Sequence, residues 1–154
     1  MFGWIIAAIV LTDQITKHLV SSSLELNQTV HVFSGLLDLT YIHNYGAAFS
    51  ILQNKQAFLI TFTGIAMAAI VIYVLKERKK LSRAELAALG LIVGGGLGNL
   101  IDRVLNGYVV DFLNIYILPV FNVADMAVCA GSALLVYSVV ILEARLRKDP
   151  SHEQ

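Results

Sequence analysis

The sequence predicts an all-α membrane protein with four transmembrane helices and a small extracytoplasmic β-containing platform, folded as a single domain over residues 1–154. Hydrophobic residues make up 57% of the chain and charged residues 14%, whereas soluble domains are about 45–50% apolar and about 25% charged. The apolar residues gather in four stretches of about 20, the length that crosses a bilayer. A net charge of zero gives the chain no overall attraction to nucleic acid.

The four helices are expected at about residues 2–21, 57–75, 84–105 and 123–142. The second is the clearest, because the stretch from Ala57 to Leu75 contains no charged residue. The first is interrupted by Asp13, Gln14 and Lys17. No basic segment precedes its apolar run and no small-residue cleavage site follows it, so we interpret it as a retained helix rather than a removed signal peptide.

The basic residues predict how these helices are oriented. Five lie in the loop 76–83 and three in the C-terminal tail, so these two segments hold eight of the eleven lysines and arginines. A path of four helices places both segments on one side, and an excess of Lys and Arg marks the cytoplasmic side of a membrane. We therefore expect a multi-pass protein with both termini in the cytoplasm and with residues 22–55 and 106–121 outside.

The long outer segment 22–55 does not have the composition of a spanning helix. β-Branched and aromatic residues in "TVHVF" and "LDLTYI" are followed by turn formers such as Ser34-Gly35, Asn44 and Gly46. This pattern is typical of short strands. We expect an extended platform that lies at the membrane surface.

Charged residues inside the spans suggest function by default, because each costs about 2.5–3.5 kcal/mol to insert. Asp13 and Lys17 lie four residues apart, the spacing of a helical ion pair. They form either a structural pair that extends toward the outer surface or a support that holds the outer segment over the site. Asn99, Asp102 and Arg103 share one face of the third helix. Asp102 is either a partner of Arg103 or a solvated acid at the interface.

Gly90, Gly94 and Gly98 recur at four-residue spacing in the third helix. Small residues at this spacing let helices approach closely in lipid. The run also resembles a phosphate-binding glycine loop, but it follows no soluble strand and lacks the lysine and the serine or threonine of that motif. Helix packing is therefore the better interpretation.

Asp111 and Asp125 are the pair of acids that indicates a catalytic function. Asp111 follows the third helix in "GYVVDFL" and Asp125 begins the fourth in "FNVADMA", so both lie at the outer interface. An N-cap at Asn122 would place Asp125 where an acid suits the helix dipole, but it does not explain Asp111. Two carboxylates in a low-dielectric site share one proton, so one can activate water while the other protonates a carbonyl. This is the chemistry of aspartic peptidases, and it needs no metal or cofactor.

Other constellations fit the sequence less well. Cys129 lies deeper in the fourth helix, is linked to no histidine by its spacing, and is interpreted as a buried, inert thiol. The histidines of the first third of the chain, with Asp38, lack a metal-ligand spacing. A small membrane transporter or ion-conducting helix bundle is the alternative function, although the acids cluster at the outer face. A structural assembly factor that uses the glycine face leaves Asp111 unexplained.

Five motifs that follow one another along the four spans resemble the lipoprotein signal peptidases, membrane-embedded aspartic peptidases of bacteria that are also called signal peptidase II. The motifs are "DQITK" (13–17), "NYGAAFS" (44–50), "GNLIDR" (98–103), "VVDF" (109–112) and "FNVAD" (121–125). The match covers nearly the whole chain. The stretch between the two acids is compact, whereas some members of the family are longer here.

The resemblance implies a protease of the bacterial cytoplasmic (inner) membrane, with its active site near the outer face. Such a protease removes signal peptides from prolipoproteins by cleavage before a diacylglyceryl-modified cysteine. It implies that Asp111 and Asp125 are catalytic. The side chains expected to line the substrate site are Asn44, Asn99, Arg103 and Asn122, and those expected to give structural support are Asp13, Lys17 and Gly98. The implied partners are prolipoproteins, membrane lipid and inhibitory cyclic peptide antibiotics, and a monomer suffices because one chain supplies both carboxylates.

Overall fold

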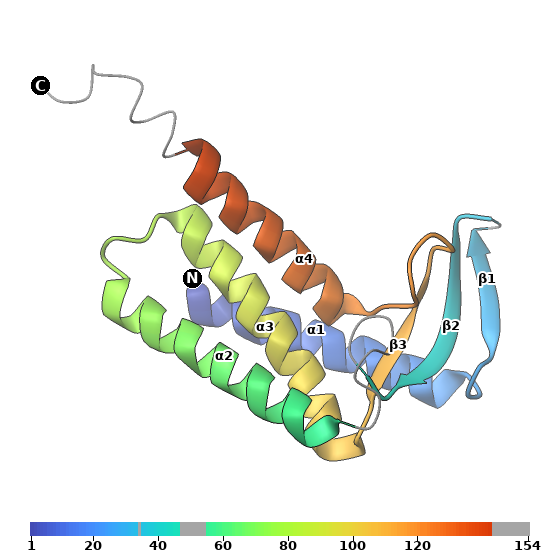
Figure 1. Ribbon diagram of the computed structural model, residues 1–154. Coiled ribbons are helices and arrows are strands. Elements are labelled where there is room, and N and C mark those ends of the chain that lie inside the picture. The colour runs from blue at the N-terminus through green and yellow to red at the C-terminus, as the bar shows by residue number, and fades with distance from the viewer. Residues whose placement is uncertain (34, 47–54, 143–154) are drawn as a thin grey trace, which may run out of the picture.

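The computed structural model describes residues 1–33, 35–46 and 55–142. It is mostly helical, with a three-stranded sheet at one end of a helical bundle (Figure 1). The helices are α1 (Phe2–Ser23), α2 (Gln56–Glu77), α3 (Arg83–Asn106) and α4 (Val123–Val136), and a π-helical segment, η2 (Tyr137–Leu142), continues α4. The strands are β1 (Thr29–Phe33), β2 (Leu37–Asn44) and β3 (Val109–Asn114).

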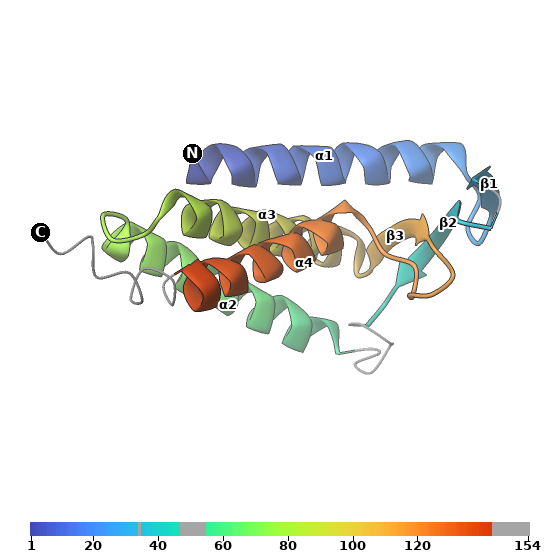
Figure 2. The ribbon, with the colours of Figure 1, turned by 90° about the horizontal axis from the view of Figure 1, so that it is seen from above.

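Helix α3 is the centre of the bundle and contacts each of the other three helices. Seen from above, α1 and α2 lie on opposite sides of it (Figure 2). The predicted packing role of the glycines is confirmed at the contact with α1. A Cβ at Gly90 would lie 3.1 Å from the side chain of Ile5, and one at Gly94 would lie 2.9 Å from that of Ile9. These glycines let α1 approach the backbone of α3.

The contact between α3 and α4 gives a stability prediction. A Cβ at Gly95 would clash with the backbone oxygen of Ala124. Because that atom moves only if α4 moves, we expect Gly95→Ala to destabilise the protein by about 1–3 kcal/mol, the usual cost of overpacking. The control is Gly64→Ala, because a Cβ at Gly64 has nothing within 4 Å. Thermal unfolding in detergent should show a lower midpoint for the first variant only, and equal midpoints would contradict the packing described.

Three helical segments in the described part of the chain are long and apolar enough to cross a membrane. They are α2, α3 and the segment Val123–Val140, which consists of α4 and the first residues of η2. Helix α1 has the same length as α2, 22 residues, but its second half contains Asp13, Gln14 and Lys17. Length and composition together therefore support three of the four predicted spans.

The β-containing segment predicted after the first helix is present as the hairpin β1–β2. A third strand, β3, pairs antiparallel with β2, and the strand order is β1-β2-β3. The sequence predicted an outer segment between the third and fourth helices but no particular secondary structure in it. Gly107 ends α3 in a left-handed conformation with φ 77°, which glycine adopts readily. The chain therefore turns at once from α3 into β3.

Cys129 is exposed, so the prediction of a buried thiol is wrong. Helix α4 turns its small residues, Ala124, Ala127 and Gly131, into the bundle. Cys129 follows Ala127 by two residues, which places it on the opposite face of the helix.

Candidate active site

Asp111 is held in a buried position at the sheet. It lies on β3 opposite Ile42 of β2, and only 1% of its surface is exposed. Its Oδ1 accepts a hydrogen bond from Asn122 Nδ2 at 2.6 Å, and its Oδ2 accepts one from Asn44 Nδ2 at 2.9 Å. Burial raises the pKa of Asp111 from 3.8 to about 7; the negative charge of Asp125 adds to this, and the two amide donors oppose it.

Asp125 is positioned by the start of α4. The predicted N-cap is confirmed: Asn122 Oδ1 accepts from the Asp125 backbone N–H at 2.9 Å, and Asp125 Oδ2 accepts from the Asn122 N–H at 3.2 Å. The other carboxylate oxygen, Asp125 Oδ1, accepts from Asn99 Nδ2 at 2.8 Å. The N-terminus of a helix is a favourable place for an acidic side chain, so the start of α4 both holds and orients Asp125.

A single buried amide joins the surroundings of the two acids. Asn122 is fully buried, and its Nδ2 lies within hydrogen-bond distance of Asp111 Oδ1, of Asn99 Oδ1 at 3.0 Å and of the Val110 carbonyl at 3.3 Å. Since Asn99 in turn donates to Asp125, both carboxylates belong to one hydrogen-bonded cluster. The structure thus brings together Asp111, Asp125, Asn99 and Asn122, with Asn44 at its edge.

Behind this cluster lies a buried ionic network. Lys17 Nζ is 2.8 Å from Asp13 Oδ2 and 3.0 Å from Asp102 Oδ2, and it donates to Asn99 Oδ1 at 3.0 Å. Asp13 Oδ1 accepts from the Ala124 N–H of α4 at 2.9 Å. The side chains of Lys17 and Asp13 are 4% and 0% exposed, so the predicted extension toward the outer surface is wrong. The pair instead joins α1 to α3 and α4.

Asp102 matches neither role predicted for it. It is 3% exposed, so it is not a solvated acid, and its ion pair is with Lys17 rather than Arg103. Its carboxylate also accepts from the Val110 N–H of β3 and from Gln14 Nε2, each at 3.0 Å. Asp102 therefore ties β3 to α1 and α3. Gln14 was missed as a network residue, although it lies within "DQITK".

Arg103 and Gly98 complete the residues singled out by sequence. Arg103 Nη2 donates to the Gly46 carbonyl at 3.2 Å, and its charge interacts with Asp125 and Asp111. It thus joins α3 to the end of the β2 segment. The residues "AAFS" of the motif 44–50 lie outside the described residues. A Cβ at Gly98 would lie 2.6 Å from Asp13 Oδ2, so a glycine here makes room for the buried acid.

His31 and His43 lie outside the carboxylate cluster. His31 Nδ1 is 2.8 Å from Asp38 Oδ2, and Tyr116 donates its hydroxyl to the same oxygen. The hydrogen bond from Tyr116 is the main cause of a lowered pKa at Asp38. His43 stacks on Tyr108 with ring centroids 3.7 Å apart. The role of His43, which the sequence left open, is thus to pack the sheet against the turn that follows α3.

The fold and the site together define a membrane enzyme, because apolar helices carry a buried pair of hydrogen-bonded carboxylates beside a small sheet. The family model described as Signal peptidase (SPase) II matches residues 5–141, and the chain belongs to this family. It is therefore a protease rather than a transporter.

Relatives and solved structures agree with this assignment. The chain is 45% identical to the lipoprotein signal peptidase of Geobacter metallireducens, over 97% of this chain and 96% of that protein. It is 41% identical to that of Brevibacillus brevis, over 92% and 96%. A solved bacterial membrane enzyme superposes with a TM-score of 0.89 at 30% identity, over 99% of this chain and 94% of the other. Another gives 0.83 at 32% identity, over 91% and 92%.

Proposed function

We propose that this protein is a lipoprotein signal peptidase that removes signal peptides from prolipoproteins, with Asp111 and Asp125 as an aspartic catalytic dyad. The observation that carries the proposal is the cluster around Asn122, in which a carboxyl with a pKa of about 7 shares hydrogen-bonded surroundings with a carboxylate at a helix N-terminus. Relatives with this name and 36–45% identity support the substrate class.

The surroundings of the two acids suggest complementary roles. Asp111 holds the shared proton at rest, because burial disfavours its ionised form, and Asp125 acts as the base. Asp125 takes a proton from water while the water oxygen attacks the carbonyl carbon before the lipidated cysteine, and Asp111 gives its proton to the carbonyl oxygen. Return of the proton from the new hydroxyl to Asp111, and transfer of the proton on Asp125 to the leaving nitrogen, break the C–N bond. The products are a carboxyl terminus on the signal peptide and a free amine on the cysteine.

The polar residues around the dyad are suited to orienting an extended peptide. Asn44 stands beside Asp111 at the end of β2, and Arg103 holds the Gly46 carbonyl just beyond it. We propose that Asn44, Asn99, Arg103 and Asn122 keep the scissile carbonyl facing the dyad. The substrate peptide would run along segment 22–50, of which residues 34 and 47–50 lie outside the described residues. One chain supplies every group in this scheme, so a monomer is sufficient, and cyclic peptide inhibitors would compete for the same site.

We propose that α1 is a fourth span and that residues 1–154 form one membrane-embedded domain. Asp13 and Lys17 of α1 are buried, whereas Trp4, Leu11, Ile15 and Leu19 are 56–82% exposed, which presents an apolar surface to lipid. At about 1.5 Å per residue, its 22 residues reach about 33 Å, enough for a bilayer core. The N-terminus and the basic α2–α3 loop lie at the end of the bundle opposite the sheet (Figure 1). By the positive-inside rule that end is cytoplasmic, and the dyad lies near the outer face.

The pH dependence of cleavage follows from the raised pKa of Asp111. Because the dyad needs one proton at rest, we expect kcat/KM to fall as the pH rises through about 7, where Asp111 loses its proton. Cleavage rates in detergent between pH 5 and 9 measure this decline. A rate that stays constant from pH 6 to 9 would contradict the assignment of the proton to Asp111.

The test of the proposed function is a cleavage assay on a purified prolipoprotein with and without the diacylglyceryl group on its cysteine. We expect cleavage of the lipidated substrate only, and mass spectrometry should find the modified cysteine as the new N-terminus of the product. Well-folded protein that cleaves neither substrate would overturn the proposal.

A further inference from the structure

We infer that Lys17 is a positioning residue for the dyad: its ammonium group orients the amide of Asn99 so that this amide donates a hydrogen bond to Asp125. The inference rests on the proposed function, because it concerns the same catalytic pair. Lys17 itself does not touch either carboxylate of the pair in the described structure. It acts through one intervening side chain.

The Asn99 amide is held in one orientation by its neighbours. An asparagine amide has an acceptor at one end and two donors at the other. Asn99 Oδ1 accepts hydrogen bonds from Lys17 Nζ and from Asn122 Nδ2, each at 3.0 Å. Turning the amide round would place an NH2 group against an ammonium and against a second NH2 group. Asn99 Nδ2 is therefore held toward Asp125 Oδ1, at 2.8 Å.

Lys17 is itself held in place by two buried acids. Its two other contacts are Asp13, one turn earlier on α1, and Asp102 of α3. Both carboxylates are buried and are fixed by further hydrogen bonds, to the Ala124 N–H and the Val110 N–H. These two acids hold the ammonium in place, which lets it fix the position of the Asn99 amide. The charged groups around this arrangement are Asp13, Asp102 and Arg103, with Asp111 and Asp125 beyond Asn99.

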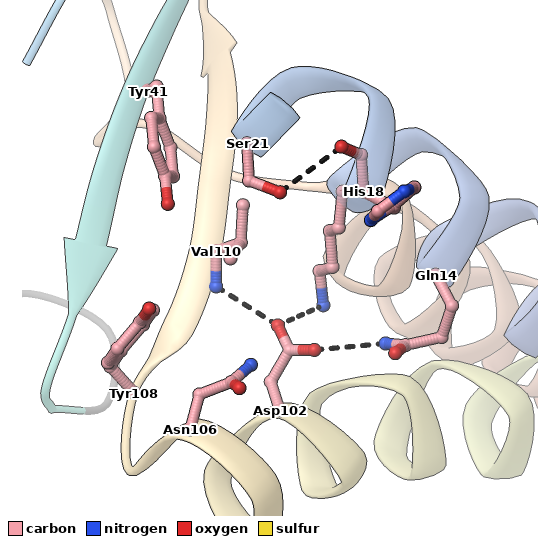
Figure 3. Close-up of a pocket in the computed structure, with 9 residues that line it drawn as sticks. Gln14, His18, Ser21, Tyr41, Asp102, Asn106, Tyr108 and Val110 are labelled. Atoms are coloured by element: carbon pink, nitrogen blue, oxygen red, sulfur yellow. Dashed lines mark hydrogen bonds and ion pairs between the residues drawn. The ribbon is translucent and has the colours of Figure 1, made fainter. Parts of the chain in front are cut away.

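A pocket of about 240 Å³ reaches Lys17 from the side away from the dyad. It lies between the outer parts of α1 and α3 and the sheet, and its lining includes Lys17, Asp102, His18 and Tyr108. Figure 3 shows the Asp102 carboxylate at this pocket, hydrogen-bonded to Val110 and Gln14, with His18 and Tyr108 around it. Shortening Lys17 to alanine would extend the pocket toward Asn99. A small amine from solution could then take the place of the missing ammonium.

This geometry makes chemical rescue the decisive experiment. Lys17→Ala should lower kcat for the lipidated substrate by about 10- to 100-fold, the effect of losing a hydrogen bond to a charged group, with KM changed much less. Ethylammonium or propylammonium should restore kcat in a saturable manner. Tetramethylammonium, which has no N–H, and propanol, which has no charge, are the matched controls. In the variant without amine, the alkaline limb of the pH profile should move to higher pH, because the charge of Lys17 lowers the pKa of Asp111.

Three results would overturn the inference: a folded Lys17→Ala variant with wild-type kcat, a loss confined to KM, or equal recovery with propanol. If this variant does not fold, Lys17→Met/Asp102→Asn replaces it, because removing one cation and one anion leaves the net charge of the network unchanged. That double variant should also show the loss in kcat, and a wild-type kcat would reject the role of Lys17. Failure of the wild-type protein to cleave, or cleavage by Asp111→Asn, would instead count against the dyad itself.

Discussion

Replacing Asp111 or Asp125 with asparagine is expected to reduce cleavage of a lipidated prolipoprotein by at least about 10²–10⁴-fold, the usual contribution of a general acid or base. Asparagine has nearly the same shape as aspartate but cannot exchange a proton with water or with a carbonyl oxygen. A gel-shift assay on both variants, in the same detergent as the wild-type protein, measures the loss. Cleavage at the wild-type rate by either variant would remove that residue from the mechanism.

Thermal unfolding supplies the folding control for Asp111→Asn. The raised pKa of Asp111 fixes the direction of the expected change in stability. Since the pKa of Asp111 is raised from 3.8 to about 7 in the folded state, the folded protein binds this proton more tightly than the unfolded chain. Its contribution to stability is complete below about pH 4 and is lost as the pH rises toward 7. We therefore expect that, at pH 8, the midpoint temperature of unfolding of the asparagine variant is no lower than that of the wild-type protein. A much lower midpoint would mean that the loss of cleavage reflects unfolding.

Asn122→Ala should have the second largest effect. This change removes the N-cap of α4 and the amide that donates to Asp111. We expect a loss of cleavage of about 100-fold and, from the cap alone, a loss of stability of about 1 kcal/mol.

Asn122→Ser separates these two consequences, because serine is also a good N-cap but has no amide NH2 group to donate to Asp111. Thermal unfolding should therefore show that serine recovers most of the lost stability, while the cleavage assay should show that activity stays low. Recovery of cleavage with serine would show that Asn122 serves only the helix.

The sequence predicted much of the bundle and the gathering of the two acids because both depend on local pattern. Apolar runs of about 20 residues locate the helices, and Asn122 followed by Asp125 forms a cap within one turn. The segment between α3 and α4 runs only from Gly107 to Val123. A connection this short cannot carry Asp111 far from Asp125.

Other features depended on partners that are distant in sequence. Lys17 lies between acids of two helices, Asp13 and Asp102, and no spacing along one helix shows that three elements meet there. The strand β3 was missed because its six residues are mostly buried on both faces, so they lack the alternation that marks a half-exposed strand. The exposure of Cys129 depends on which face of α4 meets α3.

The most direct test of the dyad is infrared spectroscopy of its protonation. We predict a protonated carboxylic acid band in wild-type protein at pH 6 that disappears as the pH rises through about 7 and is absent from Asp111→Asn. A band that persists unchanged in Asp111→Asn, or its absence from wild-type protein at pH 6, would contradict the claim that Asp111 holds the shared proton at rest.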